Sequence, residues 1–176
     1  IYEPKQRVIE SCSFKDKVVQ HVLCDNILHP KLNNVFIKYN SAGQIGKGTL
    51  YALDGLRDHM KSFYQRHGIN GWILKCDIRH FFYEIDHEIL KDIVDYFFPD
   101  PYTTWLNHTL INSSENPGLP LGNQAGQVYA LLMVHAVDCM VTGELGIVEY
   151  GRYMDDFYLI HQDKEYLRWC LECIRD

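Results

Sequence analysis

The chain has 176 residues, of which 47% are hydrophobic and 13% aromatic. This length allows one mid-sized domain or a compact pair of lobes with a sizeable core, and the composition excludes a disordered protein. No apolar run has the uninterrupted length of a membrane span and no segment resembles a signal peptide, so we expect no membrane partner.

The net charge of −6 argues against nucleic-acid binding, but the charge is unevenly distributed. Residues 1–50 contain seven Lys and Arg against four Asp and Glu, whereas residues 51–176 contain ten against nineteen. This division suits a protein that grips phosphates with its first part and holds cations with its second. A chance unevenness of surface charge is an equally good explanation.

The six cysteines are scattered and lie mostly within apolar runs, which is typical of reduced core thiols in a cytoplasmic protein. Cys170 and Cys173 form a CxxC, but no second CxxC accompanies it, and Cys170 falls on an apolar helical stripe with Leu167, Leu171 and Ile174. We therefore expect core packing there rather than zinc binding.

The first part of the chain reads as helices joined by a glycine-rich loop. Lys5 and Arg7 stand beside a short strand-like run, and apolar spacing predicts a helix over 14–28 that Pro30 closes. Residues 40–49 form the glycine-rich loop, and a second helix follows until Gly68. The loop lacks the spacing of a nucleotide-triphosphatase phosphate-binding loop, so Lys47 either presents its charge to a phosphate or belongs to a flexible connection.

The second part alternates strands and helices. Residues 72–77 predict a mostly buried strand that ends in Asp77, and Asp86 caps a helix over 86–98. Residues 103–117 read as a polar connection, and 123–141 as a long, largely buried helix. Two further strands, 147–153 and 157–161, precede a last helix that begins near Asp163.

Two adjacent acids, Asp155 and Asp156, stand at the turn between these last strands, within apolar and aromatic residues. Adjacent carboxylates resist ionising unless something neutralises them, and hard oxygen ligands suit magnesium. Solvated turn acids would be the ordinary interpretation, but the apolar flanks argue against it. A two-metal site needs a third acid from elsewhere in the chain. Asp77 stands at a strand end, but taken alone it is better explained as an ordinary strand-terminating or helix-capping acid.

Three ordered stretches resemble the palm motifs of reverse transcriptases: Asp77-Ile78-Arg79-His80-Phe81-Phe82, Gly118-Leu119-Pro120-Leu121-Gly122 and Tyr153-Met154-Asp155-Asp156. The run around Lys5 and Arg7, residues 14–20 and residues 42–49 resemble the fingers motifs of the bacterial branch. That branch includes group II intron maturases, retrons, diversity-generating retroelements and abortive-infection enzymes. The resemblance covers nearly the whole chain.

The resemblance implies an α+β fold, with a small antiparallel palm sheet backed by helices and a mainly helical fingers lobe. We expect fingers over 1–68, palm over 69–98, a connection over 99–117 and palm again over 118–176. The lysine-bearing palm segment, the primer-gripping segment and the thumb that usually follow are absent, so we expect a fragment of a longer protein. Leu121 stands where intron enzymes usually have Gln, which leaves the sub-family open.

The resemblance also implies roles for individual residues. Asp77, Asp155 and Asp156 would hold two Mg²⁺ ions, or Mn²⁺ as a substitute, with the Ile78 carbonyl as an extra ligand. The residues expected to bind the nucleotide are Lys5, Arg7, Phe82, Leu121 and Gly122, with Phe82 excluding the ribose 2′-hydroxyl and Phe81 in the core. Tyr153, Met154 and Lys47 would contact primer or template. Because Leu121 offers only hydrocarbon, we expect lower fidelity than in relatives with an amide there.

The function expected is an RNA-directed DNA polymerase core from a group II intron-like or related bacterial retroelement. Its partners would be an RNA template, a DNA primer and dNTPs, with a structured intron RNA as a further candidate, while the oligomeric state is open. One alternative is an RNA-binding maturase fragment that assists splicing with little polymerase activity. A metal-dependent nuclease could use the same acids but would not explain Phe82 or the glycine-proline motif.

Overall fold

The structure is a computed structural model that describes residues 12–115 and 117–175. Its described residues form two compact units, each made of two chain segments. Unit 1 contains the described residues up to Leu32 together with His80–Met133, and unit 2 contains Asn33–Arg79 and Val134 onward. The predicted fingers and palm boundaries differ from this division, and they remain functional predictions.

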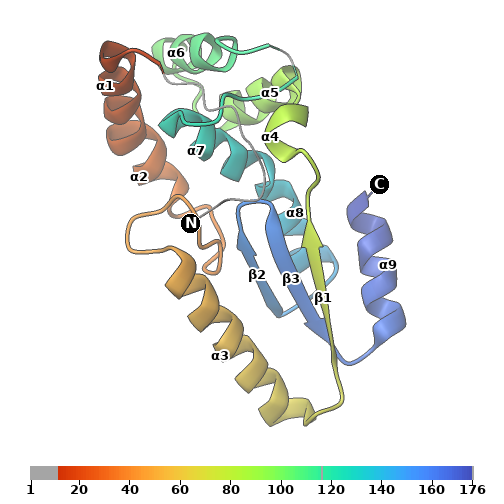
Figure 1. Cartoon of the computed structure of the whole chain (residues 1–176). Helices are drawn as coiled ribbons and strands as arrows, with labels where there is room; N and C mark the ends of the chain where they lie inside the picture. Colours follow the sequence, from red (N-terminus) through yellow and green to blue (C-terminus); the bar gives the residue numbers. More distant parts are fainter. Residues whose placement is uncertain (1–11, 116, 176) are drawn as a thin grey trace, which may run out of the picture. The chain divides into compact units, whose positions relative to one another are not determined.

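Unit 1 is helical. Its elements in chain order are α1 (Phe14–Leu23), the π-helical turn η1 (Cys24–Leu28), α2 (His29–Leu32), α4 (Phe81–Glu84), α5 (His87–Phe97), α6 (Pro101–Ile111) and α7 (Gln124–Met133) (Figure 1). Helix α7 packs against α1, α5 and α6, and seven of its residues are buried. A buried hydrogen bond from Tyr129 Oη to Asn107 Oδ1, 2.9 Å long, joins α7 to α6. Helix α7 is the first part of the long buried helix predicted over 123–141, and it lies at the centre of unit 1.

Two predictions in unit 1 were wrong. Pro30 lies within α2 instead of closing the helix, and it follows the widened turn η1, where the N–H of His29 donates to Cys24. Residues 101–111 form α6 instead of a polar connection, with Pro101 in its first turn and the Asp100 side chain accepting from the Thr103 N–H. Proline is well suited to the first turn of a helix, where its missing N–H has no partner to lose.

Unit 2 is built on a three-stranded antiparallel sheet in the order β1-β3-β2. The strands are β1 (Trp72–Asp77), β2 (Glu149–Tyr153) and β3 (Asp156–His161), so the predicted α+β fold and all three predicted strands are confirmed. The helical elements are α3 (Thr49–His67), α8 (His135–Cys139), the π-helical turn η2 (Met140–Glu144) and α9 (Lys164–Arg175).

The two faces of this sheet are covered differently. One face belongs to a hydrophobic core that includes Phe157, Leu159, Val141 of η2, and Leu167 and Cys170 of α9. Burial of Cys170 agrees with the core role expected for the CxxC. The other face meets α3, where Arg66 forms an ion pair with the buried Glu149 of β2. Figure 1 shows α3 and α9 on opposite sides of the strands.

The helical run Gln124–Glu144 corrects the expectation about membrane spans. By length and composition alone this run could cross a membrane. However, 56% of its 18-residue window is buried inside the protein, as in the core helix of a water-soluble protein.

Candidate active site

The backbone of unit 2 brings the three predicted acids together at one end of the sheet. Asp77, the last residue of β1, is the cross-strand partner of Asp156, the first residue of β3. Directly opposed residues on antiparallel strands have Cα atoms about 4.5–5.5 Å apart and side chains on the same face. The N–H of Ile78 also donates to the carbonyl of Asp155, at 3.2 Å. Two distant segments of the chain therefore meet where the sequence predicted that they would.

A two-residue turn carries the acidic pair. Strand β2 ends at Tyr153 and β3 begins at Asp156, so Met154 and Asp155 alone connect them. Met154 has a φ of 54°, while Asp155 has a negative φ. Positive φ at only the first connecting residue is the pattern of a type II′ hairpin turn, where glycine is the usual residue. Met154 is thus held in a conformation that side chains disfavour, which occurs most often at functional sites.

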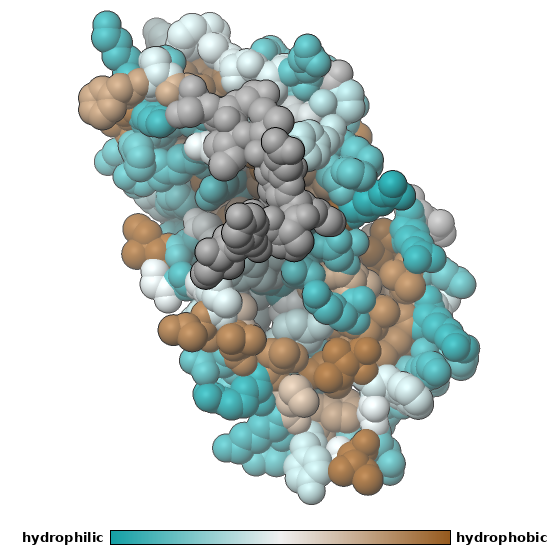
Figure 2. Space-filling model, in the orientation of Figure 1, coloured by the Kyte–Doolittle hydropathy of each residue, from teal (hydrophilic) through white to brown (hydrophobic). Residues whose placement is uncertain are grey.

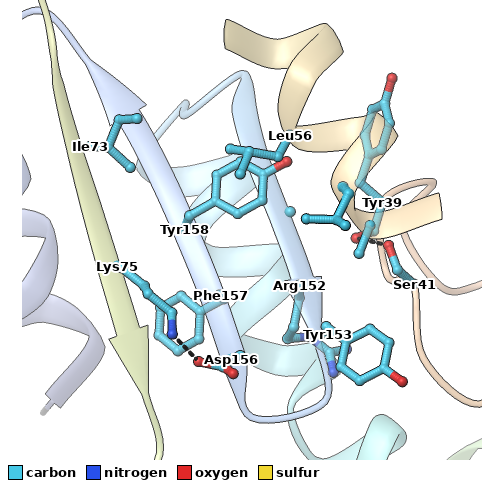
Figure 3. Close-up of a pocket in the computed structure, with 13 residues that line it drawn as sticks. Tyr39, Ser41, Leu56, Ile73, Lys75, Arg152, Tyr153, Asp156, Phe157 and Tyr158 are labelled. Carbon is cyan, nitrogen blue, oxygen red and sulfur yellow. Dashed lines mark hydrogen bonds and ion pairs between the residues drawn. The ribbon is translucent and has the colours of Figure 1, made fainter. Parts of the chain in front are cut away.

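A lysine that the sequence analysis overlooked lies against the acids. Lys75 of β1 lies two residues before Asp77 on the same face, and its Nζ is 2.9 Å from Asp156 Oδ1. Figure 3 shows the two side chains meeting near the sheet end. The hydrogen bond to Asp156 and the charge of that carboxylate raise the pKa of Lys75. Lys75 and Asp77 are two residues apart in a predicted strand, which places their side chains on the same face. This spacing was the signal that could have identified Lys75.

The donor chemistry of this end of the sheet fits a divalent cation. Three acidic residues lie at the adjoining ends of β1 and β3, and the Lys75 ammonium shows that the carboxylate of Asp156 already accepts a cationic neighbour. Oxygen ligands of this kind suit Mg²⁺ and Mn²⁺. Within residues 12–115 and 117–175, no three His, Cys, Asp or Glu side chains are already arranged as a metal site. The structure thus supplies the ligand types, while binding would need their carboxylates to reorient.

An apolar cavity of about 270 Å³ within unit 2 is lined by Asp156 and twelve other residues. It lies on the α3 side of the sheet, and Figure 3 shows Leu56, Ile73 and Tyr158 along it. Gly151 makes room for the Tyr158 ring, because a Cβ there would lie 2.5 Å from the Tyr158 hydroxyl oxygen. In Figure 2 hydrophobic side chains form a band over the region of α3 and the strands.

The residues predicted to contact primer or template lie in different surroundings. Tyr153 is 39% exposed and lines the cavity, and Met154 is half-buried in the turn. Lys47 Nζ donates to the carbonyls of Lys38 and Asn40, at 2.9 and 3.0 Å, and burial lowers its pKa. The Lys47 ammonium therefore stabilises the glycine-rich loop through hydrogen bonds to its backbone. Contact between Lys47 and primer or template stays a prediction.

The predicted nucleotide-binding residues are divided between unit 1 and the part of the chain that is not described. Lys5 and Arg7 lie outside the described residues. In unit 1, Phe81 is buried, as predicted, and Phe82 is partly exposed, with its carbonyl accepting from the N–H of Leu119 at 2.7 Å. Leu121 lines a cavity of about 320 Å³ together with Tyr83, residues 113–115 and residues 117–120. Gly122 is exposed and has a φ of 113°.

Solved structures of telomerases share this fold. The apo telomerase of Candida tropicalis, truncated from its C-terminal domain, is 13% identical with a TM-score of 0.65, over 94% of this chain and 40% of that one. Telomerase of Candida albicans in complex with a fragment of telomeric RNA is 12% identical with a TM-score of 0.67, over 91% and 32%. The chain thus spans at most two fifths of these proteins, and such low identity shows the fold alone.

Comparison by sequence identifies the family. No curated protein matches the chain. A comparison with protein families matches residues 3–176, almost the entire chain, to the family described as reverse transcriptase (RNA-dependent DNA polymerase). With that match, and with the acids of the predicted motifs side by side in the sheet, the chain belongs to the reverse transcriptase family.

Proposed function

We propose that the chain is the nucleotidyl-transfer core of an RNA-directed DNA polymerase. In this proposal Asp77, Asp155 and Asp156 hold two Mg²⁺ ions, with the Ile78 carbonyl as a further ligand. The pairing of Asp77 with Asp156, beside Asp155, is the observation that carries it, because it unites acids from two distant motifs. When bound, the ions would stabilise the charge that develops on the attacking and leaving oxygens of the phosphoryl transfer.

The protein's own contribution at this site is to present carboxylates from a rigid backbone. The Ile78 N–H holds the Asp155 carbonyl, and the sheet fixes the spacing of Asp77 and Asp156. Lys75 neutralises Asp156 until a stronger cation takes its place. The backbone positions of the ligands are therefore fixed in advance, so that metal binding requires only side-chain reorientation.

Further roles follow from the motifs. Phe82 would exclude a ribose 2′-hydroxyl, Arg7 and Lys5 would hold the triphosphate, and Leu121 and Gly122 would lie near the incoming nucleotide. Guanidinium forks match phosphate oxygens, which supports the assignment of Arg7. Tyr153, Met154 and Lys47 remain candidates for contact with primer or template.

The proposed partners are an RNA template, a DNA primer and dNTPs, and membership of the reverse transcriptase family supports them. One telomerase with the same fold was solved with a fragment of its RNA, which supports an RNA partner for this chain as well. The proposed source is a group II intron-like or related bacterial retroelement, with the sub-family left open, and a structured intron RNA is a further candidate partner. All six cysteines lie in the part of the chain that the structure describes, and each is a free thiol. Free thiols support a cytoplasmic location.

Primer extension tests the polymerase proposal. The chain is assayed with Mg²⁺ or Mn²⁺ on RNA and DNA templates, with dNTPs compared with NTPs, at high protein concentration. We expect extension on RNA with dNTPs, and loss of at least about a thousandfold for Asp155→Asn, in line with removal of a metal ligand. Phe82→Ala should admit NTPs.

The same assay separates the alternatives. Tight RNA binding without extension, unchanged by Asp155→Asn, would favour a splicing-assistance role and contradict the polymerase proposal. Cleavage of RNA or DNA that depends on Asp155, without extension, would favour a nuclease.

A further inference from the structure

A fully buried ion pair lies directly behind the acidic turn in unit 2. Arg152 of β2 is two residues before Met154, and its side chain faces Asp138 of α8, with neither side chain exposed to solvent. Arg152 Nε donates to Asp138 Oδ1 at 2.8 Å, and Nη2 donates to Asp138 Oδ2 at 2.6 Å. This two-point contact fixes the guanidinium in one orientation.

The same guanidinium also reaches the turn itself. Arg152 Nη1 donates to the carbonyl of Met154 at 3.0 Å. The next carbonyl, that of Asp155, accepts from the Ile78 N–H at 3.2 Å. Both carbonyls of the two-residue turn therefore accept a hydrogen bond. The carbonyl of Met154 is held by Arg152, which is itself bound to α8, and the carbonyl of Asp155 is held by the residue that follows β1.

The backbone of Arg152 is fixed as well. Its N–H donates to the carbonyl of Tyr39 and its carbonyl accepts from the Ser41 N–H, each at 2.9 Å. These bonds join β2, an outer strand of the sheet, to the segment before α3. With main chain and side chain both anchored, Arg152 is a rigid support for the turn.

Asp138 stays ionised in this buried position. Burial opposes its charge, but hydrogen bonds and charge from Arg152, with contributions from His135 and Tyr150, outweigh burial and lower the pKa of Asp138. Tyr150 Oη donates to Asp138 Oδ1 at 2.7 Å. Opposite charges thus balance behind the turn, and the pair adds no net charge to the site.

We propose that Arg152, oriented by Asp138, is a positioning residue for metal binding at the turn. Met154 holds a φ of 54° that its side chain disfavours, and the bond from Arg152 to its carbonyl keeps the turn in that conformation. The direction in which Asp155 and Asp156 leave the turn depends on it. Groups that orient metal ligands commonly change metal affinity by about 10–100-fold when they are lost. This inference rests on the proposed function.

Direct Mn²⁺ binding to the 176-residue chain, followed by the EPR signal of free Mn²⁺, provides the test. Arg152→Lys keeps the charge opposite Asp138 but loses the planar fork that reaches Asp138 and Met154 together. We expect Mn²⁺ affinity to fall by about tenfold. Tyr150→Phe is the matched control, because it removes another hydrogen bond to the same carboxylate without touching the turn, and its affinity should stay unchanged.

A double variant keeps the test decisive if Arg152→Lys unfolds the protein. Glycine adopts positive φ without strain, so Met154→Gly should restore folding and part of the Mn²⁺ affinity to Arg152→Lys. Unchanged affinity in Arg152→Lys, an equal loss in Tyr150→Phe, or no recovery in the double variant would overturn the positioning role.

Asp155→Asn separates this inference from the proposed function. If Asp155→Asn weakens Mn²⁺ binding but Arg152→Lys does not, the positioning role alone is wrong. If Asp155→Asn leaves Mn²⁺ binding unchanged, the metal site itself is wrong, and both proposals fail together.

Discussion

Lys75 Nζ and Asp156 Oδ1 lie 2.9 Å apart, so an ammonium is bound to a carboxylate that the proposed function assigns to a metal ion. Both side chains are substantially exposed, and water screens an exposed ion pair. Lys75→Met should therefore leave the free energy of unfolding nearly unchanged. It should raise Mn²⁺ affinity up to about fivefold, because the competing cation is gone.

An Mn²⁺ titration of the variant checks this. Lys61→Met, which removes an exposed lysine of α3, is the control for the change in net charge. A weaker site in Lys75→Met would mean that the lysine helps to hold the carboxylate in place instead of competing with the ion.

The ion pair between Arg66 and Glu149 predicts a loss of stability. Glu149 is buried in β2, whereas Arg66 is 44% exposed, so removing the arginine leaves a buried carboxylate without its partner. Arg66→Ala should lower the free energy of unfolding by about 2–3 kcal/mol, below the range for a fully buried pair because water reaches the arginine. Urea unfolding measures the loss.

Arg57→Ala on the same helix is the matched control. Arg57 pairs with Asp54 while both side chains are mostly exposed, so this change should cost no more than about 0.5 kcal/mol. Equal losses for the two variants would show that Arg66 acts through helix α3 in general and not through Glu149.

His59 predicts a pH dependence of stability. It is buried on α3, its Nδ1 lies 2.9 Å from the Tyr158 hydroxyl oxygen, and burial lowers its pKa below 6.5. The unfolded chain therefore binds more protons between that lowered value and 6.5, and stability falls as the pH drops through this window. His59→Asn should remove a slope of up to about 1.4 kcal/mol per pH unit.

Urea unfolding between pH 5 and 7.5 measures the slope. Tyr158→Phe is the control, because it removes the hydroxyl partner but keeps the imidazole, so stability should fall while the slope remains. Burial also lowers the pKa of His29 in unit 1, so His59→Asn should reduce the total slope without abolishing it. An undiminished slope would contradict the assignment to His59.

The turn at Met154 predicts a gain in stability. A side chain in the left-handed region costs about 1 kcal/mol or more, and glycine avoids this cost but adds freedom to the unfolded chain. Met154→Gly should therefore raise the free energy of unfolding by about 0.5–1 kcal/mol. Met154→Asn, which tolerates positive φ, should give a smaller gain in thermal or urea unfolding, and a loss in both variants would show that contacts of the methionine side chain dominate.

The strands could be predicted from the sequence because they depend on local patterns, whereas the meeting of the acids was implied by the resemblance to reverse transcriptases. A run of β-prone residues ends in Asp77, and a second pair of runs surrounds Asp155 and Asp156. The capped helix α6 was also readable, since Asp100 precedes a proline and stands three residues before Thr103. Pro101 was interpreted only as a helix breaker, so the start of α6 was not predicted.

The support behind the turn could not be predicted in the same way. Asp138 lies in an apolar helical run, where a lone acid shows no partner, and its pairing with Arg152 depends on how α8 packs on the sheet. An arginine in a strand of otherwise buried residues was the signal available, because a buried charge requires an opposite charge. Similarly, the sequence could not show that Lys47 bonds to the carbonyls of its own loop.

Leu121 predicts a measurable effect on fidelity. It is a half-buried apolar residue that lines the cavity beside Tyr83, and the proposed function places it near the incoming nucleotide. A glutamine at this position could form a hydrogen bond that the leucine cannot, and one such bond contributes about 0.5–1.5 kcal/mol. Leu121→Gln should therefore lower misincorporation by roughly two- to tenfold.

The measurement is misincorporation during primer extension on an RNA template, with one dNTP withheld. Leu121→Met is the matched control, because it keeps a hydrocarbon-like side chain of similar volume and should leave fidelity unchanged. If both variants alter misincorporation equally, the shape of the cavity sets fidelity and the missing amide does not. If neither does, Leu121 lies too far from the nucleotide to take part in its selection.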